Sequence, residues 1–225
     1  MQNKEKVALF DFCETIANFQ TGDAYINYVR NQTGNKLMKR KASFRVLLHK
    51  LWLIPVLSLL FPRLSVNKRL VLWQLKGFSK SELDSYAKAY YENVVRLNLI
   101  PEVVEELKRL QKDHWRILIV SAGYEIYLKY FCEDFGIPQE NLIAVKIKFN
   151  NDKCAGTFDG GDRLWDKTQK LDELFDRNRI YSVAYSDSIS DLLMLQWANE
   201  GIVVRSADRN NWADKYHFKQ IVWKK

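Results

Sequence analysis

Residues 7–15 read Val-Ala-Leu-Phe-Asp-Phe-Cys-Glu-Thr, so four apolar side chains are followed directly by a carboxylate. A short apolar run without a polar face is typical of a strand that is buried on both faces of a parallel sheet. The run therefore predicts a strand over residues 7–10, with Asp11 at its carboxyl end. Ligands of open α/β sheets bind at that edge, which makes Asp11 the first candidate site residue.

Two further apolar runs end in polar residues. Residues 116–120 lead into Ser-Ala-Gly at 121–123, and residues 181–185 lead into Ser-Asp-Ser-Ile-Ser-Asp at 186–191. Between these runs, Lys167 begins a helical pattern. Because parallel strands end at one edge of their sheet, we expect a carboxylate, a hydroxyl, a lysine and a carboxylate pair to meet there. Such a group predicts a metal site beside an anion site.

These motifs resemble those of the haloacid dehalogenase-like superfamily, specifically its phosphoserine phosphatase-like branch. The family's first motif, Asp-x-Asp-x-Thr after an apolar strand, reads Asp-Phe-Cys-Glu-Thr at residues 11–15. The second motif is a Ser or Thr after an apolar strand, matched by Ser121, and the third is a Lys at a helix start, matched by Lys167. The fourth, Gly-Asp-x-x-x-Asp, corresponds to residues 186–191. The motifs follow the family's order, and the resemblance covers residues 7 to about 204.

The resemblance implies an α/β fold, with a Rossmann-like parallel sheet covered by helices on both faces and an inserted all-helical cap domain. The alternation of helical and strand patterns after residue 100 indicates the same architecture. Residues 17–100 read as helical, and the family inserts its cap at this point. We therefore expect residues 1–16 and 101–225 to form the core domain and residues 17–100 to form the cap domain.

Local signals predict further elements. Thr21 and Asp23 are suited to cap a helix, and residues 79–82 have the spacing of a capping box. Residues 142–158 alternate around an Asn-Asn-Asp turn, which is typical of a hairpin. The apolar side chains of residues 210–225 predict a tail that packs against the rest of the protein.

The resemblance also implies an enzyme, a magnesium-dependent phosphohydrolase in which Asp11 attacks phosphorus and forms an aspartyl-phosphate. It implies Mg²⁺ as the cofactor, held by the side chains of Asp11 and Asp187 and the backbone carbonyl of Cys13. Asp191 lies one helical turn beyond Asp187 and is expected either to ligate the metal through water or to orient the site lysine. Thr15 ends the first motif and is counted with Asp11 and Cys13 as catalytic.

The phosphate would be held by a second group of residues. Ser121 is suited to donate a hydrogen bond to a phosphoryl oxygen, helped by backbone N–H groups of Ala122 and Gly123 at the start of a helix. Lys167 would supply positive charge to the same oxygens, and Lys170 is its rival for that role. The alternatives are an ordinary helix cap for Ser121 and a surface position for the lysine.

Cys13 departs from the family's pattern, because phosphatases of the family carry a general acid/base Asp at this position. A thiol has an unperturbed pKa of about 8.5, which makes it a poorly matched proton donor, although a nearby metal favours the thiolate. Three readings stay open. The enzyme hydrolyses phosphate esters slowly or only those with activated leaving groups, or the substrate supplies its own acid. The third is a non-catalytic module that binds a phosphorylated ligand or an anionic membrane. Dehalogenase chemistry is a weaker alternative, because it needs no magnesium and the carboxylate pair Asp187 and Asp191 is retained.

Composition sets the remaining limits. The 225 residues are 47% apolar, which excludes a disordered chain. Three cysteines without C-x-x-C spacing predict neither disulfides nor a zinc site, and the amino terminus has no apolar signal region, so we expect a cytoplasmic protein. The net charge of +8 is concentrated in residues 24–81, which hold twelve lysines and arginines and no acidic residue. This asymmetry predicts an anionic partner for the segment.

The basic cap admits three readings. Residues 51–61 are apolar but far fewer than the roughly 20 that span a bilayer, so they are suited to a peripheral place in the interface of an anionic membrane. A lipid-linked phosphate would then be a natural substrate. Alternatively the charges steer a small soluble phosphate, or the apolar residues form a helical core or a dimer contact. No nucleic-acid motif is present, so no specific nucleic acid is expected, and the oligomeric state is left open.

Overall fold

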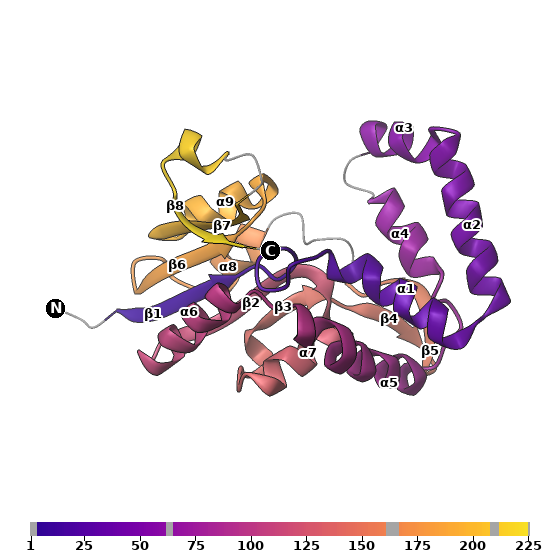
Figure 1. Cartoon of the computed structure of the whole chain (residues 1–225), viewed down its shortest axis with the longest axis horizontal. Coiled ribbons are helices and arrows are strands. Elements are labelled where there is room, and N and C mark those ends of the chain that lie inside the picture. Colours follow the sequence, from indigo (N-terminus) through magenta and orange to yellow (C-terminus); the bar gives the residue numbers. More distant parts are fainter. Residues whose placement is uncertain (1–3, 62–64, 161–166, 208–211, 225) are drawn as a thin grey trace.

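A computed structural model of the chain describes residues 4–61, 65–160, 167–207 and 212–224. Its centre is a six-stranded sheet with the order β3-β2-β1-β6-β7-β8, in which each neighbouring pair is parallel (Figure 1). The strands are β1 (Glu5–Phe10), β2 (Arg116–Tyr124), β3 (Leu142–Val145), β6 (Ile180–Ser186), β7 (Glu200–Ser206) and β8 (Lys219–Trp223). The central strand β1 therefore lies between β2 and β6, and the ends of these three strands are neighbours.

Strand β1 is buried on both faces, as its apolar run predicts. Val7 and Leu9 belong to one hydrophobic core and Ala8 and Phe10 to another, and none of the four is accessible to solvent. The first core contains side chains of α8 and α9, and the second contains side chains of α6 and α7. The predicted parallel α/β sheet with helices on both faces is therefore confirmed. These helices are α6 (Pro101–Lys112), α7 (Glu125–Asp134), α8 (Lys167–Leu174) and α9 (Leu192–Trp197), with short 3₁₀ turns η4 (Gln139–Asn141), η6 (Ile189–Asp191) and η7 (Ala213–Tyr216).

The described residues between β1 and α6 form helices and, besides isolated bridges, no strand. Ser79 and Glu82 form the predicted capping box at the start of the last long helix of this segment. Its assignment as a separate cap domain stays a prediction. The helices are α1 (Thr21–Thr33), α2 (Lys36–Lys50), α3 (Leu53–Leu60), α4 (Val66–Trp73), α5 (Lys80–Tyr90), η2 (Tyr91–Val95) and η3 (Arg96–Asn98).

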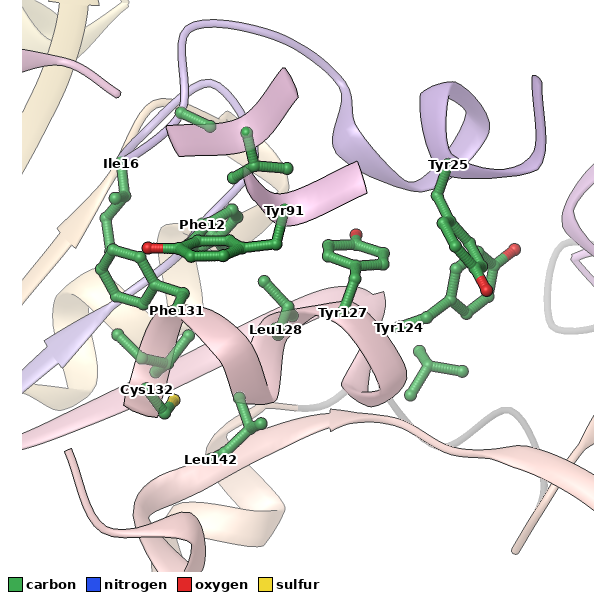
Figure 2. Close-up of a cluster of buried hydrophobic side chains, with 14 of the residues drawn as sticks. Phe12, Ile16, Tyr25, Tyr91, Tyr124, Tyr127, Leu128, Phe131, Cys132 and Leu142 are labelled. Carbon is green, nitrogen blue, oxygen red and sulfur yellow. The ribbon is translucent and has the colours of Figure 1, made fainter. Parts of the chain in front are cut away.

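Buried aromatic rings join α1 to the core. Tyr25 of α1 lies against Tyr124 and Tyr127, with ring centroids 6.4 and 5.4 Å apart (Figure 2). The Tyr25 hydroxyl donates to the backbone carbonyl of Leu83 in α5 at 2.8 Å, so this buried polar group is satisfied. The first cap helix is thereby fixed beside the end of β2, where the sequence places Ser121.

The predicted hairpin is present over residues 147–158, whereas residues 142–145 form β3 of the large sheet instead of belonging to the hairpin. The hairpin contacts the helical segment between β1 and α6. Strands β4 (Ile147–Asn150) and β5 (Lys153–Phe158) form a separate antiparallel pair. The backbone N–H of Gly77 donates to the carbonyl of Cys154 at 2.9 Å, and the N–H of Cys154 donates to the carbonyl of Phe78 at 2.8 Å. Gly156 has a φ of +74°, and a Cβ there would lie 3.2 Å from Cα of Trp73, so this close approach requires glycine. Hairpin and cap therefore form one continuous surface.

One local expectation is wrong, and the expectation that the tail packs is confirmed and extended. Strand β2 extends through Tyr124 and α7 begins at Glu125, so Ala122 and Gly123 end a strand rather than open a helix. In addition, residues 219–223 of the tail do more than pack, because they form β8 and pair in parallel with β7. The tail residues 210, 211 and 225 lie outside the described part of the chain.

Large apolar side chains are exposed where α2 meets α3. We call this surface the α2–α3 corner, and its exposed fractions run from 40% for Leu57 to 82% for Leu59. Among the described residues no single helix is long and apolar enough to cross a membrane, whereas α2 and α3 meet that criterion only jointly and are bent by 73°. These side chains therefore do not form a core within the chain, and the helical-core reading is wrong for them. The corner consists of Leu47, Leu51, Trp52, Leu53, Val56, Leu57, Leu59, Leu60 and Phe61.

Candidate active site

The carboxyl ends of β1, β2 and β6 form one side of a cavity of about 470 Å³. Its walls come from both parts of the chain, because the sheet edge supplies most of the predicted site residues and the cap supplies the rest. The predicted residues that line it are Asp11, Cys13, Ser121, Ala122, Gly123, Lys167, Asp187 and Asp191. The cap contributes Gln20, Gly22, Asp23, Ser65 and Lys68.

Lys167 connects two of the predicted carboxylates. Its Nζ lies 2.8 Å from Oδ1 of Asp11 and 2.7 Å from Oδ2 of Asp191, and all three side chains are buried. Asp191 also accepts the hydroxyl of Ser186 at 2.7 Å, so it orients Lys167, one of the two roles that the sequence suggests. Lys170 instead pairs with the exposed Glu173 at the surface. The structure therefore places Lys167, and not its rival, in the cavity.

The site holds more carboxylates than ammonium groups, and the pKa values of Asp11 and Lys167 are both raised. Burial raises the pKa of Asp11 even though the Lys167 cation acts to lower it, and the charge of Asp191 raises it further. Burial alone would lower the pKa of Lys167, but Asp11 and Asp191 raise it overall, so the lysine stays charged. With Asp187, Asp23 and Lys68 also on the cavity, four carboxylates and two ammonium groups line it. A cation would relieve this excess of negative charge.

Thr15 links the first and fourth motifs. Its Oγ1 is within 3.2 Å of both Oδ2 of Asp11 and Oδ1 of Asp187, and it accepts the backbone N–H of Asp187 at 2.9 Å. A hydroxyl has one proton, so it donates to one carboxylate at a time. Thr15 is wholly buried and thus fixes the spacing of the two carboxylates. It acts as a positioning residue for them.

The donor set fits a magnesium ion in part. Asp11 and Asp187 are hard oxygen ligands on one cavity, which is the kind of site that Mg²⁺ occupies with one or two carboxylates and several waters. Among the described residues, no three side chains of His, Cys, Asp or Glu gather closely enough to enclose a metal without such waters. Coordination by the Cys13 carbonyl and any water-mediated contact of Asp191 stay predictions.

The end of β2 forms the side of the cavity where the sequence predicts a phosphate-binding group. The Ser121 side chain is fully buried, and its Oγ accepts the backbone N–H of Gly123 at 3.0 Å. A Cβ on Gly123 would lie 2.5 Å from the hydroxyl of Tyr127, so only glycine fits there. An oxyanion at this edge would therefore meet the Ser121 hydroxyl and strand-end backbone rather than a helix N-terminus.

Cys13 lies at the entrance of a buried chain of hydroxyl groups. Its Sγ is 3.0 Å from Oγ1 of Thr21, which is 2.8 Å from the hydroxyl of Tyr127. Burial raises the pKa of the Cys13 thiol, and the charge of Asp11 raises it further, so the group is a neutral thiol at pH 7. The predicted capping role of Thr21 is wrong, because Gln20 is the N-cap of α1 and makes no side-chain cap bond. Sequence reasoning missed Tyr127 because the contact spans 106 residues.

Lys68 of α4 brings positive charge from the cap to the cavity. Its Nζ donates to the backbone carbonyl of Ala122 at 2.6 Å, directly beside Ser121. The acid-free composition of residues 24–81 indicated an anionic partner for this segment, but it did not single out this lysine. Lys68 and Lys167 thus approach the cavity from different parts of the chain.

Comparisons with solved structures give the same fold. A protein of unknown function from Bordetella pertussis is 15% identical and covers 97% of this chain and 99% of its own, with a TM-score of 0.77. A phosphoserine phosphohydrolase-like protein from Francisella tularensis is 20% identical, and the match covers 88% of this chain and 87% of that protein, with a TM-score of 0.61. A substrate-bound phosphoserine phosphatase is 18% identical, and the match covers 90% of this chain and 87% of that protein, with a TM-score of 0.59. At these identities the likeness shows the fold alone.

The sequence comparisons identify the family. No curated protein matches the chain. The family described as haloacid dehalogenase-like hydrolase matches residues 8–196, which include all four motifs and the cap segment between the first two. This span is most of the chain, and the sheet that carries the motifs has the family's parallel α/β architecture. The chain therefore belongs to the haloacid dehalogenase-like hydrolases.

Proposed function

We propose that this protein is a magnesium-dependent phosphohydrolase that cleaves a small or lipid-linked phosphate monoester through an aspartyl-phosphate on Asp11. The observation that carries the proposal is the contact of Asp11 with Lys167 at 2.8 Å at the end of the central strand. The carboxylate is held on a cavity that also presents the Ser121 hydroxyl and Asp187. These are the groups that an in-line transfer of a phosphoryl group to a carboxylate requires.

In the first half of the reaction, a carboxylate oxygen of Asp11 forms a bond to phosphorus while the bond from phosphorus to the ester oxygen breaks. Lys167 and Ser121 stabilise the phosphoryl oxygens, whose charge increases in the transition state. When bound between Asp11 and Asp187, magnesium would supply the positive charge that lets two anions approach each other. In the second half, a water oxygen forms a bond to phosphorus while the bond from phosphorus to the Asp11 oxygen breaks. Phosphate leaves with the two protons of the water, and Asp11 is again a carboxylate.

The departing ester oxygen needs a proton. The family's proton donor is an Asp, and this chain has Cys13 at that position. Its neutral thiol donates weakly and is already in contact with Thr21. Esters with acidic leaving groups need little such help, so they should be the better substrates. Lys68 of α4 adds a positive charge to the same cavity, and this charge favours dianionic phosphate monoesters over uncharged compounds.

The weak donor at position 13 also supports a second candidate, a non-catalytic module that binds a phosphorylated ligand. Such a module would keep Lys167, Ser121 and the magnesium carboxylates but would turn over no ester. A dehalogenase is a poorer match, because its chemistry has no use for Asp187.

A panel of phosphate esters, assayed with magnesium and with EDTA, tests the proposal. We expect magnesium-dependent release of phosphate from the wild type, and no release from Asp11→Asn or Asp187→Asn. The matched control, Asp113→Asn at the exposed C-terminal end of α6, should keep wild-type turnover. Magnesium should also raise the melting temperature of the wild type and of the control but not that of Asp187→Asn. Magnesium-dependent stabilisation without turnover would favour the binding module, and an unchanged magnesium shift in Asp187→Asn would contradict the metal site.

A further inference from the structure

The α2–α3 corner is an ordered apolar face without a partner in the described part of the chain. Leu53, Val56, Leu57 and Leu60 follow the i, i+3, i+4, i+7 spacing of one helix face, and each is at least 40% exposed. Ile54 points to the opposite side and is buried, with 4% exposed. Helix α3 therefore packs on one side only and presents its other side to the surroundings. Contiguous exposed apolar surfaces of this kind mark interaction sites.

Positive charge accompanies the apolar face. Lys36, Lys39, Arg40 and Lys50 of α2 are all exposed. No acidic residue occurs anywhere in residues 24–81, so nothing within the segment neutralises these charges. The surface consequently combines apolar side chains whose burial would be favourable with cations that an anionic partner would neutralise.

The position of the corner leaves it accessible. Figure 1 shows α2 and α3 at the edge of the molecule, away from the six-stranded sheet, with α4 leading from α3 toward β5. Trp52 marks the turn between the two helices and is 71% exposed. Leu51 and Leu53 flank this Trp and Lys50 lies two residues before it, a composition that partitions into the head-group layer of a membrane.

We propose that the α2–α3 corner docks on the surface of an anionic lipid bilayer. The leucines, Trp52 and Phe61 enter the head-group region, and the lysines and Arg40 of α2 contact lipid phosphates. The 73° bend and the exposed cations along α2 fit a pair of helices that lies in the interface rather than one that crosses it.

Charge distinguishes this occupant from a second copy of the chain. A symmetric dimer through the corner would bring the same basic patch of two copies together, and like charges oppose such an interface. An anionic bilayer covers the same leucines while neutralising the lysines. The inference concerns where the protein binds rather than its chemistry, so it does not depend on the proposed function.

Sedimentation with vesicles tests the proposal. The full chain should sediment with vesicles of phosphatidylglycerol and phosphatidylcholine and much less with pure phosphatidylcholine. Each basic residue near an anionic surface raises partitioning about fivefold, so Lys39→Glu/Arg40→Glu/Lys50→Glu should lower it at least about 100-fold. The control Lys88→Glu/Lys112→Glu/Lys224→Glu changes net charge equally at exposed positions elsewhere and should lower it much less.

A second pair of variants tests the apolar contribution. Leu59→Ser/Leu60→Ser should lower partitioning at least about tenfold, because the side chains lose apolar area that the bilayer would cover. The control Leu97→Ser/Leu193→Ser alters two leucines that are 75% and 63% exposed at other sites, and it should leave binding unchanged. Circular dichroism melting curves confirm that each variant is folded.

Four results would overturn the proposal. They are equal binding to both kinds of vesicle, equal loss in the variants and their controls, no binding to any vesicle, and a dimer in solution that Leu59→Ser/Leu60→Ser dissociates. The last result would assign the corner to a second copy of the chain.

Discussion

Lys167 Nζ lies 2.8 Å from Oδ1 of Asp11, and only 7% and 9% of the two side chains are accessible to solvent. The pair joins the first and third motifs across 156 residues. Since an unpaired charge is costly in such a place, the lysine both favours the ionised form of Asp11 and stabilises the folded chain. Activity and stability should therefore depend on the same contact.

The first prediction concerns this lysine. Without magnesium, Lys167→Met should lower the free energy of unfolding by about 3 kcal/mol at pH 8, because Asp11 is left buried without its cation. The pKa of Asp11, already raised by burial, rises further in the variant. A raised pKa stabilises the folded state at low pH, and that stabilisation is lost as the pH rises through the folded-state pKa. The deficit should thus be smaller at pH 5 than at pH 8.

Lys170→Met is the matched control, because Lys170 makes an exposed pair with Glu173. We expect it to change stability by less than about 0.5 kcal/mol at either pH. Denaturant titrations of both variants measure the difference. Equal deficits in the two variants, or a Lys167→Met deficit that does not change with pH, would contradict the role of the buried pair.

The second prediction concerns Thr21, whose hydroxyl lies between Cys13 and Tyr127. Thr21→Val should destabilise the chain by about 1–3 kcal/mol, because the buried Tyr127 hydroxyl loses its side-chain partner and keeps only the backbone of Tyr124. Tyr127→Phe removes that hydroxyl, so the double variant should be destabilised by less than the sum of the single variants. Additive effects in urea unfolding would show that the two hydroxyl groups do not depend on each other.

The third prediction concerns Lys68, which reaches the pocket from α4 and donates to the carbonyl of Ala122. If it helps to bind the dianionic phosphate, Lys68→Met should raise KM about tenfold and change kcat by less than about threefold. Lys76→Met, an exposed lysine that follows the same helix, is the control and should change neither constant. A fall in kcat at constant KM would place Lys68 in the chemical step instead.

Much of this architecture is predictable from the sequence, because strands buried on both faces have continuous apolar runs. The runs that become β1, β2 and β6 end at the predicted polar residues, and the parallel sheet brings Asp11, Lys167 and Asp187 together. Local propensity also explains the capping box of α5 and the β4–β5 turn. These features depend on neighbours in sequence or on one rule of sheet topology.

The missed features depend on long-range packing. Strand β8 lies at a sheet edge, and its residues are in turn exposed, half-buried, half-buried, exposed and buried, so no regular alternation marks it as a strand. Thr21 has the appearance of a helix cap until Tyr127, far along the chain, brings its own hydroxyl to it. The apolar side chains of α2 and α3 suggest a core equally well from composition, and only the three-dimensional arrangement shows that they are exposed.

The fourth prediction concerns Cys13, the position where the chain departs from its family. Cys13→Asp should raise the hydrolysis of alkyl phosphates at least about tenfold and barely change that of nitrophenyl phosphate, because only the alkoxide needs a strong proton donor. Cys13→Asn, which has the same shape but no acid, is the control and should give no gain. A wild type that is already fast on alkyl esters and is slowed by Cys13→Asp would show that another donor serves the reaction.

The most direct test of the central claim is to trap the covalent intermediate on Asp11. The protein is mixed with a nitrophenyl phosphate and magnesium, quenched in acid during steady turnover, digested and measured by mass spectrometry. The account predicts a peptide containing residues 7–15 that has gained one phosphoryl group, with the group assigned to Asp11 and absent from Asp11→Asn. Steady turnover without any phosphorylated Asp11 would contradict the account. Undiminished turnover in Asp11→Asn would contradict it as well.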